Sequence, residues 1–285
     1  MENKEYKSFY KIVGGGEGSR CNYPARLDAY GCGCQHNCKY CYAKSLLDFR
    51  KLWDNKHPSI ANIDKIKRKI ENLSSYNPLR LGGMSDCFMP MEKIYKVTYE
   101  TIKALNEKGI GYLIVTKSNL VADDDYIGIM DKKLAHIQVS ITSTDDDISL
   151  SYEKASVPSE RITAIEKLAK LGFDVQVRLS PYIPQYIDMN IINAIKCDKI
   201  LVEFLRANSW IKKWFTDVDY SEYTVKDGGY QHLPLERKIE LMKKITNFSQ
   251  ITVCEDVPSH YDYWKENVNY NKEDCCNLRI QDKEK

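Results

Sequence analysis

Three cysteines in a short loop constrain this chain more than any other feature. Cys34, Cys38 and Cys41 follow the spacing C-x3-C-x2-C, and an aromatic residue, Tyr40, stands directly before the last of them. A loop this short can turn all three thiolates toward one metal site. Structural zinc sites normally take four ligands, and typical ferredoxin clusters take four cysteines. Three cysteines therefore predict a [4Fe–4S] cluster with one iron that no side chain binds, a position open to a substrate or cofactor.

Two other interpretations fit the same residues. Cys32 can complete a four-cysteine zinc site with the other three, and the loop can also carry unligated thiols. His36, inside the loop, is expected to be exposed and to have no catalytic role. What favours a cluster is the place of the loop in the predicted fold.

Strand and helix patterns alternate along the chain from residue 26 onward. The strand candidates are 26–30, 79–82, 111–116, 136–142, 174–180 and 199–205. The helical patterns between and after them are 40–51, 60–73, 93–108, 123–130, 159–171 and 189–196. This alternation predicts parallel βαβ units. Six units, with a further helix at 235–247 and a possible strand at 251–254, predict an α/β fold: a partial (β/α)6 barrel of the TIM type.

We expect one domain over residues 1–285. Its core spans about 26–206, preceded by an N-terminal flap at 1–25 that carries a glycine-rich run at 14–18. The C-terminal extension at 207–285 is expected to set substrate specificity. Ligands collect at the carboxyl ends of the strands in such folds. Because the cysteine loop follows the first strand, we expect the site at that end.

The ends of the later strands carry residues suited to a ligand. Gly82 and Gly83 follow the second strand and let a ligand approach the backbone closely. Lys117 follows the third strand and can meet a carboxylate, and the hydroxyl of Ser140 in the fourth can bond a ribose. Arg178 lies in the fifth strand, and burying its charge would be costly without an anionic partner. A cofactor carboxylate is a suitable partner.

Together these motifs resemble the radical S-adenosylmethionine superfamily and, within it, the spore-photoproduct-lyase-like branch. The resemblance to that branch covers about residues 26–188. It is carried by Gly83, Asp86, Pro90, Glu92, Thr116, Lys117, Ser118, Glu153, Pro158, Arg161, Leu168, Gly172, Pro181, Tyr182, Ile183 and Pro184.

The resemblance implies a [4Fe–4S] cluster on Cys34, Cys38 and Cys41, and S-adenosylmethionine bound at the open iron. It also implies a 5′-deoxyadenosyl radical that takes hydrogen from a substrate, and a reductant protein of the flavodoxin or ferredoxin type. The residues expected to bind the cofactor are Tyr40, Gly82, Gly83, Ser85, Asp86, Lys117, Ser140 and Arg178.

Two positions depart from the pattern of that branch. Met84 replaces the usual Glu, so Ser85, Asp86 or backbone carbonyls would take the amino group of the cofactor. In spore photoproduct lyase a cysteine two residues before the Ser-Asp pair donates a hydrogen atom, and here that position is Gly83. Repair of thymine dimers therefore loses support.

Two further residues are candidates for a catalytic role. Tyr42, just after the last loop cysteine, is expected to lie beside the reacting radical. Cys87 is an alternative thiol donor, although a packed small hydrophobic residue is its more common role.

Residues after the fifth strand are expected to contact the substrate: Tyr182, Glu203, Arg206 and Glu255. Glu203 and Glu255 could pair with an amine of the substrate, and Arg206 with a phosphate or carboxylate. Ion pairs at the barrel rim are the alternative interpretation. Aromatic walls are expected from Tyr182, Phe204, Trp210 and Trp214.

Charge and hydropathy narrow the substrate and the cellular location. The 42 Lys and Arg residues against 40 Asp and Glu residues give a formal charge of +2. Proteins that act on duplex DNA usually carry a basic face, so near-neutrality favours a small substrate and no duplex nucleic acid. No apolar run approaches the about 18 residues of a membrane span, and the N-terminus lacks a signal-peptide core. We expect a cytoplasmic protein that contacts no membrane.

In that compartment the 10 cysteines are expected to be metal ligands and free thiols. Cys275 and Cys276 are expected to be unpaired thiols, with a further metal clip as the alternative. We predict a radical lyase that acts on a small nucleoside or nucleotide. A DNA-lesion lyase and a non-enzymatic iron–sulfur or zinc binding module are the alternatives.

Overall fold

The computed structural model describes residues 6–11, 20–73 and 78–279. The strands of its central sheet are β1 (Phe9–Lys11), β2 (Ala25–Leu27), β5 (Leu79–Leu81), β6 (Tyr112–Thr116), β7 (Ala135–Ile141), β8 (Asp174–Tyr182), β9 (Lys199–Phe204) and β12 (Gln250–Val253). They form an eight-stranded sheet in the order β1-β2-β5-β6-β7-β8-β9-β12. β1 is antiparallel to β2, and the other neighbouring pairs are parallel. The partial TIM-type α/β fold is confirmed.

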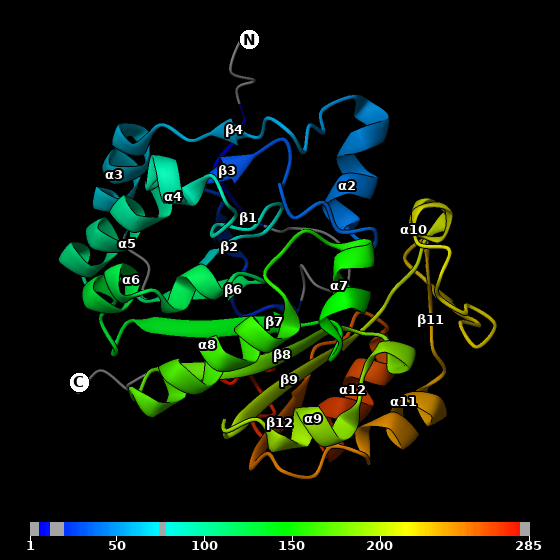
Figure 1. Ribbon diagram of the computed structural model, residues 1–285. Coiled ribbons are helices and arrows are strands. Elements are labelled where there is room, and N and C mark those ends of the chain that lie inside the picture. Colours follow the sequence, from blue (N-terminus) through cyan, green and yellow to red (C-terminus); the bar gives the residue numbers. More distant parts are fainter. Residues whose placement is uncertain (1–5, 12–19, 74–77, 280–285) are drawn as a thin grey trace.

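Helices connect the parallel strands (Figure 1). Those up to β8 are α2 (Tyr42–Leu47), α3 (Ile63–Glu71), α4 (Glu92–Tyr95), α5 (Val97–Lys108), α6 (Asp124–Ile129), α7 (Asp146–Tyr152) and α8 (Pro158–Lys170). The later ones are α9 (Met189–Ala194), α10 (Ser209–Trp214), α11 (Leu235–Met242) and α12 (Pro258–Asn267). Short 3-10 turns are η1 (Asp48–Arg50), η2 (Asn119–Ala122) and η3 (Pro184–Tyr186). Two small antiparallel pairs are β3 (Tyr30–Gly31) with β4 (Ser59–Ile60), and β10 (Val225–Asp227) with β11 (Tyr230–His232).

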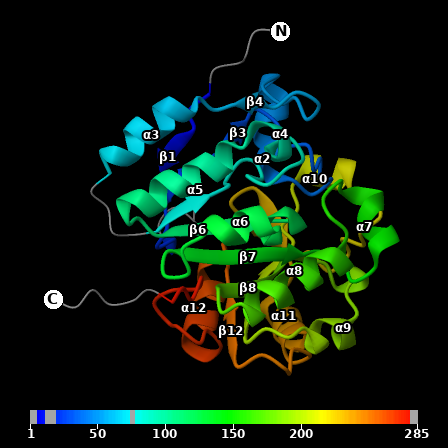
Figure 2. The same cartoon turned by 60° about the vertical axis from the view of Figure 1, so that its left-hand side comes forward.

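The two faces of the sheet differ because successive strand residues point to opposite sides. In β7, Ile137 and Val139 face one side, and Gln138 and Ser140 face the other, all of them buried. α8 packs on β7 and β8, and Figure 2 shows α5, α6 and α8 on the same side of the sheet. Each fully buried aliphatic side chain contributes roughly 1.5–3 kcal/mol. The apolar face therefore holds the fold together, and the polar face is left to line the inside of the barrel.

Helix α8 shows how the chain marks the ends of its units. Pro158 occupies the first turn, where its missing N–H has no helical partner to lose. After the helix, Gly172 adopts a φ of 82°, a left-handed conformation that favours glycine. The predicted helix at 159–171 is confirmed to within one residue at either end.

The predicted helix at 93–108 is divided into α4 and α5, with Lys96 between them at a φ of 52°. The cause is the buried carboxylate of Glu92. It accepts hydrogen bonds from the backbone N–H groups of Thr98 and Tyr99, both at 2.9 Å, and from Tyr126 Oη at 2.6 Å. These bonds cap the first turn of α5, so the chain starts a new helix there instead of continuing α4.

The two extensions take part in the sheet. Within the expected flap, Phe9–Lys11 forms β1 on the edge of the sheet, which corrects the prediction for those residues. The glycine-rich run at 14–18 lies outside the described residues. β12, from the C-terminal extension, pairs in parallel with β9, where the extra strand was predicted. β1 and β12 are the two ends of the strand order, so the barrel is partial.

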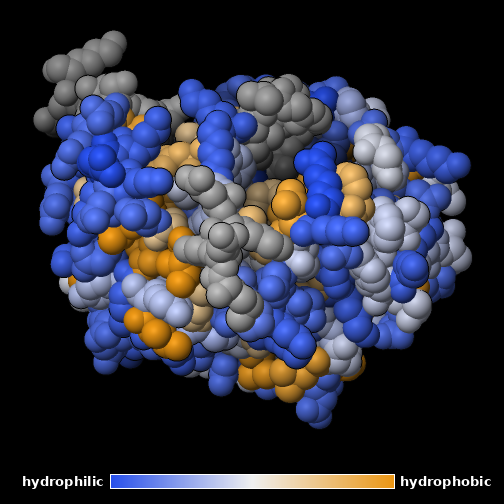
Figure 3. Space-filling model, turned by 90° about the horizontal axis from the view of Figure 1, so that it is seen from above, coloured by the Kyte–Doolittle hydropathy of each residue, from blue (hydrophilic) through white to orange (hydrophobic). Residues whose placement is uncertain are grey.

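The surface seen from above in Figure 3 is mostly hydrophilic, with smaller hydrophobic areas between. In the part of the chain that the structure describes, no helix is both long and apolar enough to cross a membrane.

Candidate active site

The cysteine loop is held in shape by close backbone packing. A Cβ on Gly33 would lie 1.9 Å from the carbonyl oxygen of Asp54, so only glycine fits there. The loop is tied to the end of α7 by hydrogen bonds from Lys39 N to Tyr152 O (2.9 Å) and from Lys154 N to His36 O (2.6 Å). The sequence spacing and these contacts together fix where the three thiols point.

All three predicted cysteines line one cavity. Cys41 is the N-cap of α2, and its sulfur accepts a hydrogen bond from Lys44 N at 3.4 Å. Burial raises the pKa of the Cys34 thiol to about 12 and also raises the pKa of Cys41. Thiols this well shielded from water need a nearby cation to lose their protons. A cluster of iron ions supplies that charge, so the donor set fits an iron–sulfur cluster.

The cavity has a volume of about 1040 Å³, including its open mouth. It brings together residues from the loop and from the carboxyl ends of β5 to β9. Its predicted members are Cys34, Cys38, Tyr40, Cys41, Tyr42, Gly82, Gly83, Ser85, Asp86, Lys117, Ser140, Arg178, Phe204, Glu203 and Arg206. Most of the predicted site residues thus lie around one cavity. Cys32 is not among the residues that line the cavity.

Asp86 and His36 form a buried pair in this wall. Asp86 accepts hydrogen bonds from Thr116 Oγ1 and Lys117 N, both at 2.7 Å, and His36 Nδ1 lies 3.4 Å from Asp86 Oδ2. Burial works against ionisation of Asp86, but His36 and these donors hold its pKa below the usual range. The expectation that His36 is exposed is wrong, because its side chain is 3% exposed and packs against this carboxylate.

A second buried carboxylate, Asp28, fixes the glycine turn after β5. It accepts hydrogen bonds from Gly83 N (2.7 Å), Met84 N (3.0 Å) and Tyr10 Oη (3.0 Å). Burial raises the pKa of Asp28. The conformation of the turn is therefore fixed by Asp28, which does not itself line the cavity. The Ser85 hydroxyl donates to Tyr30 O, so it too has a partner within the chain.

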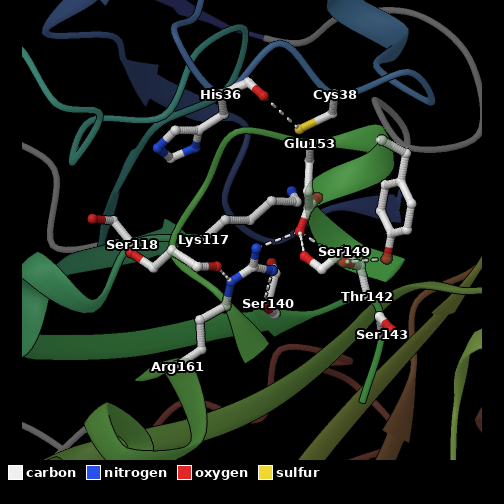
Figure 4. A network of polar contacts seen from close by, with 12 residues as sticks. His36, Cys38, Lys117, Ser118, Ser140, Thr142, Ser143, Ser149, Glu153 and Arg161 are labelled. Atoms are coloured by element: carbon white, nitrogen blue, oxygen red, sulfur yellow. Dashed lines mark hydrogen bonds and ion pairs between the residues drawn. The ribbon is translucent and has the colours of Figure 1, made fainter. Parts of the chain in front are cut away.

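Glu153 is the centre of a network behind the cavity wall (Figure 4). Its carboxylate accepts hydrogen bonds from Tyr40 Oη, Thr142 Oγ1 and the guanidinium of Arg161. Arg161 also donates to Ser140 O at 3.0 Å. Burial disfavours the charge on Glu153, but Arg161 and Lys117 outweigh it and lower the pKa. The buried ion pair of Glu153 and Arg161 thus binds two parts of the cavity wall: Glu153 accepts from Tyr40, and Arg161 donates to the Ser140 carbonyl.

Arg178 already has an anionic partner within the chain. Its guanidinium pairs with Glu203 and donates to Gln138 Oε1 at 2.7 Å. Burial disfavours ionisation of Glu203, yet Arg178 and Arg206 lower the pKa of its carboxyl to about 2. A cofactor carboxylate is thus not needed to balance the charge of Arg178. Arg206 pairs with Asp256 and lies 5.4 Å from the centre of the Tyr42 ring.

Five predicted site residues do not line the cavity. Cys87 is buried in the core beside it, where burial raises its thiol pKa well above the usual value. Tyr182 lines a separate hollow with Met189 and Arg237. The carboxylate of Glu255 forms an ion pair with Lys238 at 2.5 Å, and both side chains are buried. Glu255 is therefore occupied within the protein and does not face the cavity. Trp210 and Trp214 are likewise absent from the lining.

Among the residues that shape the site, sequence reasoning missed the polar side chains of Asp28, Arg80 and Ser180. Arg80 and Ser180 line the cavity, and Asp28 supports it. Alternation along the strands was the available signal. Arg80 lies between Leu79 and Leu81 in β5, so it points to the opposite face of the sheet from its apolar neighbours.

No group of three His, Cys, Asp or Glu side chains converges on a single ion among the described residues. The three thiols instead line one cavity together with polar residues from the strand ends.

Comparison with known proteins identifies the family. Residues 30–196, more than half of the 285 residues, match the radical SAM superfamily. The chain belongs to the radical SAM superfamily. Members of this family use a [4Fe–4S] cluster and S-adenosylmethionine.

One relative is an uncharacterized protein of Methanocaldococcus jannaschii. It is 32% identical over 168 residues, which cover 56% of this chain and 61% of the relative. The chain thus spans less than two thirds of that relative.

Solved structures with a similar fold include a spore photoproduct lyase mutant with bound AdoMet and dinucleoside spore photoproduct. Its TM-score is 0.59 at 16% identity, covering 82% of this chain and 77% of that one. SuiB of Streptococcus suis, bound to its precursor peptide SuiA, has a TM-score of 0.57 at 15% identity. That match covers 85% of this chain and 51% of SuiB. These likenesses show the radical SAM fold.

Proposed function

We propose that this protein is a radical SAM lyase in which Cys34, Cys38 and Cys41 bind the [4Fe–4S] cluster. The observation that carries the proposal is the shared cavity. The three thiols meet polar groups from five successive strand ends there. A three-cysteine donor set leaves one iron for the amino and carboxylate groups of S-adenosylmethionine. When bound, the cluster and S-adenosylmethionine would supply radical chemistry that begins with removal of a hydrogen atom from the substrate.

The residues of the chain then have separate tasks. Lys117 lines the cavity with its ammonium 5.6 Å from the centre of the Tyr40 ring, and we assign it to the carboxylate of S-adenosylmethionine. We assign the Ser140 hydroxyl to the ribose, and the turn at Gly82 and Gly83 to close contact between the cofactor and the backbone. Phe204, Leu205 and Ile211 form an apolar wall that excludes water from a reactive radical.

For the substrate we propose a small nucleoside or nucleotide, and specifically queuosine or queuosine 5′-phosphate. The protein would act as queuine lyase and release queuine by cleaving the N-glycosidic bond. The formal charge of +2 supports a small substrate over duplex DNA. Arg206 at the cavity is the candidate for a phosphate. Glu203, rather than Glu255, is the acid within reach of an amine, because only Glu203 lines the cavity.

Gly83 argues against a DNA-lesion lyase of the spore photoproduct type. A Cβ there would lie 2.0 Å from Tyr10 Oη and 2.9 Å from Arg26 Cδ. A cysteine at this position would therefore displace both side chains. Cys87 does not line the cavity, so the described residues offer no thiol at the place where that reaction draws its hydrogen atom.

The test is anaerobic incubation of the reconstituted, reduced protein with S-adenosylmethionine and queuosine 5′-phosphate. Chromatography with mass detection should find queuine and 5′-deoxyadenosine together. A control incubation with a dinucleoside spore photoproduct should give no conversion of the photoproduct back to thymidine residues. Deoxyadenosine without queuine would refute the substrate and leave the radical chemistry. A Cys38→Ala variant that still forms deoxyadenosine would refute both.

A further inference from the structure

Four cysteines outside the loop gather at one place inside the barrel. Cys21 precedes β2, Cys254 follows β12, and Cys275 and Cys276 lie after α12. Cys276 is buried, and the other three pack against the small cluster that it forms with Tyr23, Leu113 and Leu201. The thiol of Cys275 is within hydrogen-bonding contact of both Cys254 and Cys276. Four soft ligands from three distant segments are thus brought together by the fold.

The group lies where the barrel is left open. β2 and β12 are near opposite ends of the strand order, and the segments 20–23 and 273–279 meet between them. Tyr23 Oη donates to Asp274 Oδ2 at 2.7 Å, and Asn22 Nδ2 donates to Glu273 O at 2.6 Å. On the other side, Lys199 Nζ donates to Asn277 O at 2.8 Å. The C-terminal segment therefore fills the interior between the two edges of the sheet.

Cationic side chains lie near this group of thiols. Arg80 and Arg178 interact electrostatically with Cys276, and Arg26 and Arg80 with Cys21. A divalent metal with four thiolates carries a net charge of about −2. Arg178 is already paired with Glu203, so buried Arg26 and half-buried Arg80 are the nearby cations that would contribute most to balancing such a centre.

We propose that Cys21, Cys254, Cys275 and Cys276 form a second, closed metal centre that binds a thiophilic metal, either a zinc ion or another iron–sulfur cluster. Thiolate ligands select these two classes of centre among the metals common in proteins. The centre cross-links three parts of the chain at the open side of the barrel: the segment before β2, the end of β12 and the C-terminal segment. With four protein ligands it has no open position, in contrast to the loop cluster, and it is structural.

The cysteine sulfur atoms in the structure are not arranged around a single metal position. Neither this group nor the loop has three ligand atoms converged on one ion in the described residues. Metal binding would therefore require the cysteine side chains to turn toward one point, and rotation about χ1 is the first movement open to them.

The experiment removes the loop cluster first. A Cys34→Ala/Cys38→Ala/Cys41→Ala variant is produced with iron and zinc supplied and purified without oxygen. Elemental analysis should then find about one zinc per chain, or iron with matching sulfide and a visible absorption band. Either result supports the second centre and identifies its metal. A variant that retains neither metal would overturn it. Because this variant has no loop cluster, the result is independent of the proposed function.

A second set of variants locates the ligands. Adding Cys275→Ser and Cys276→Ser to the triple variant should remove the remaining metal and lower the melting temperature. Cys197→Ser, at a buried cysteine that belongs to neither group, is the matched control and should retain it. If the double change prevents folding, Cys254→Ser, at a half-buried position, replaces it and should likewise remove the remaining metal. Unchanged metal content in these variants, or a disulfide within the group in the freshly isolated protein, would contradict the proposal.

Discussion

The two groups of cysteines in this protein are built in opposite ways. Cys34, Cys38 and Cys41 lie within eight consecutive residues, and a local loop is enough to bring them together. The second group, Cys21, Cys254, Cys275 and Cys276, comes from segments up to 255 positions apart, and only the folded barrel brings them together. The first group opens into a cavity, whereas the second packs among apolar side chains.

The difference teaches what each group can do. A contiguous loop at the mouth of the barrel can leave one coordination position open to a small molecule, which suits chemistry. A group drawn from both ends of the chain closes the fold when it binds a metal, which suits stability. Changes to the cysteines themselves should therefore have separable effects, the loop cysteines on activity and the second group on folding.

The largest effect is expected from the network behind the loop. Glu153→Gln leaves Arg161, which is 0% exposed, without its anionic partner. Breaking a buried ion pair on one side costs roughly 3–5 kcal/mol, which we expect in the free energy of unfolding measured with denaturant. Glu160→Gln, at an exposed position of α8, is the control and should change stability little. A loss below about 1 kcal/mol for Glu153→Gln would show that the ion pair does not hold the loop.

A slightly smaller effect should appear in acid. The pKa of Glu203 is lowered from 4.5 to about 2 in the folded protein. A lowered folded-state pKa adds stability at neutral pH that is lost as the pH falls from about 4.5 to about 2. The ionised Glu203, held by Arg178, Arg206 and the Ser180 hydroxyl together, therefore contributes on the order of 3 kcal/mol that acid removes. Unfolding of Glu203→Gln should depend less on pH over that interval than unfolding of the wild type, and equal slopes would contradict this account.

The next prediction separates the second group from the loop. Asp274 accepts hydrogen bonds from Tyr23 Oη and from the backbone N–H groups of Cys276 and Leu278. Asp274→Ala leaves these buried donors unpaired, at a cost of about 1–3 kcal/mol. Melting should occur at lower temperature while the absorption of the loop cluster stays unchanged. Glu273→Ala, at the exposed neighbouring acid, is the control. Loss of the loop cluster in Asp274→Ala would show that the two groups are not independent.

The smallest effect is expected at Cys87, which lies beside the cavity without lining it. Cys87→Ala removes one buried atom and should cost about 1 kcal/mol. Formation of 5′-deoxyadenosine and of product should be unchanged in rate, as measured by chromatography. A loss of product with retained deoxyadenosine would instead identify Cys87 as a hydrogen donor.

Much of the fold could be predicted because it depends on local patterns. The six predicted strands, their order and the helix before Gly172 follow from apolar periodicity and from glycine and proline at the boundaries. The break at Lys96 could not be predicted, since it depends on Glu92 meeting Tyr126 from a later helix. The antiparallel edge strand Phe9–Lys11 was missed for a similar reason, because three residues carry little pattern of their own.

The site divides in the same way. Residues at strand ends, such as Lys117 and Ser140, were predicted because parallel strands bring their ends together. The partners of charged residues were not predicted. The burial of His36 against Asp86 and the pairing of Arg178 with Glu203 join segments that sequence alone does not connect.

The central claim is that the loop cysteines hold a cluster with one iron open to S-adenosylmethionine. Electron paramagnetic resonance of the reduced, reconstituted protein tests it most directly. We predict a [4Fe–4S] signal with a component that shifts when S-adenosylmethionine is added, and this responsive component is absent in Cys38→Ala. A spectrum with no component that S-adenosylmethionine shifts, or a responsive component that persists without Cys38, would contradict the account.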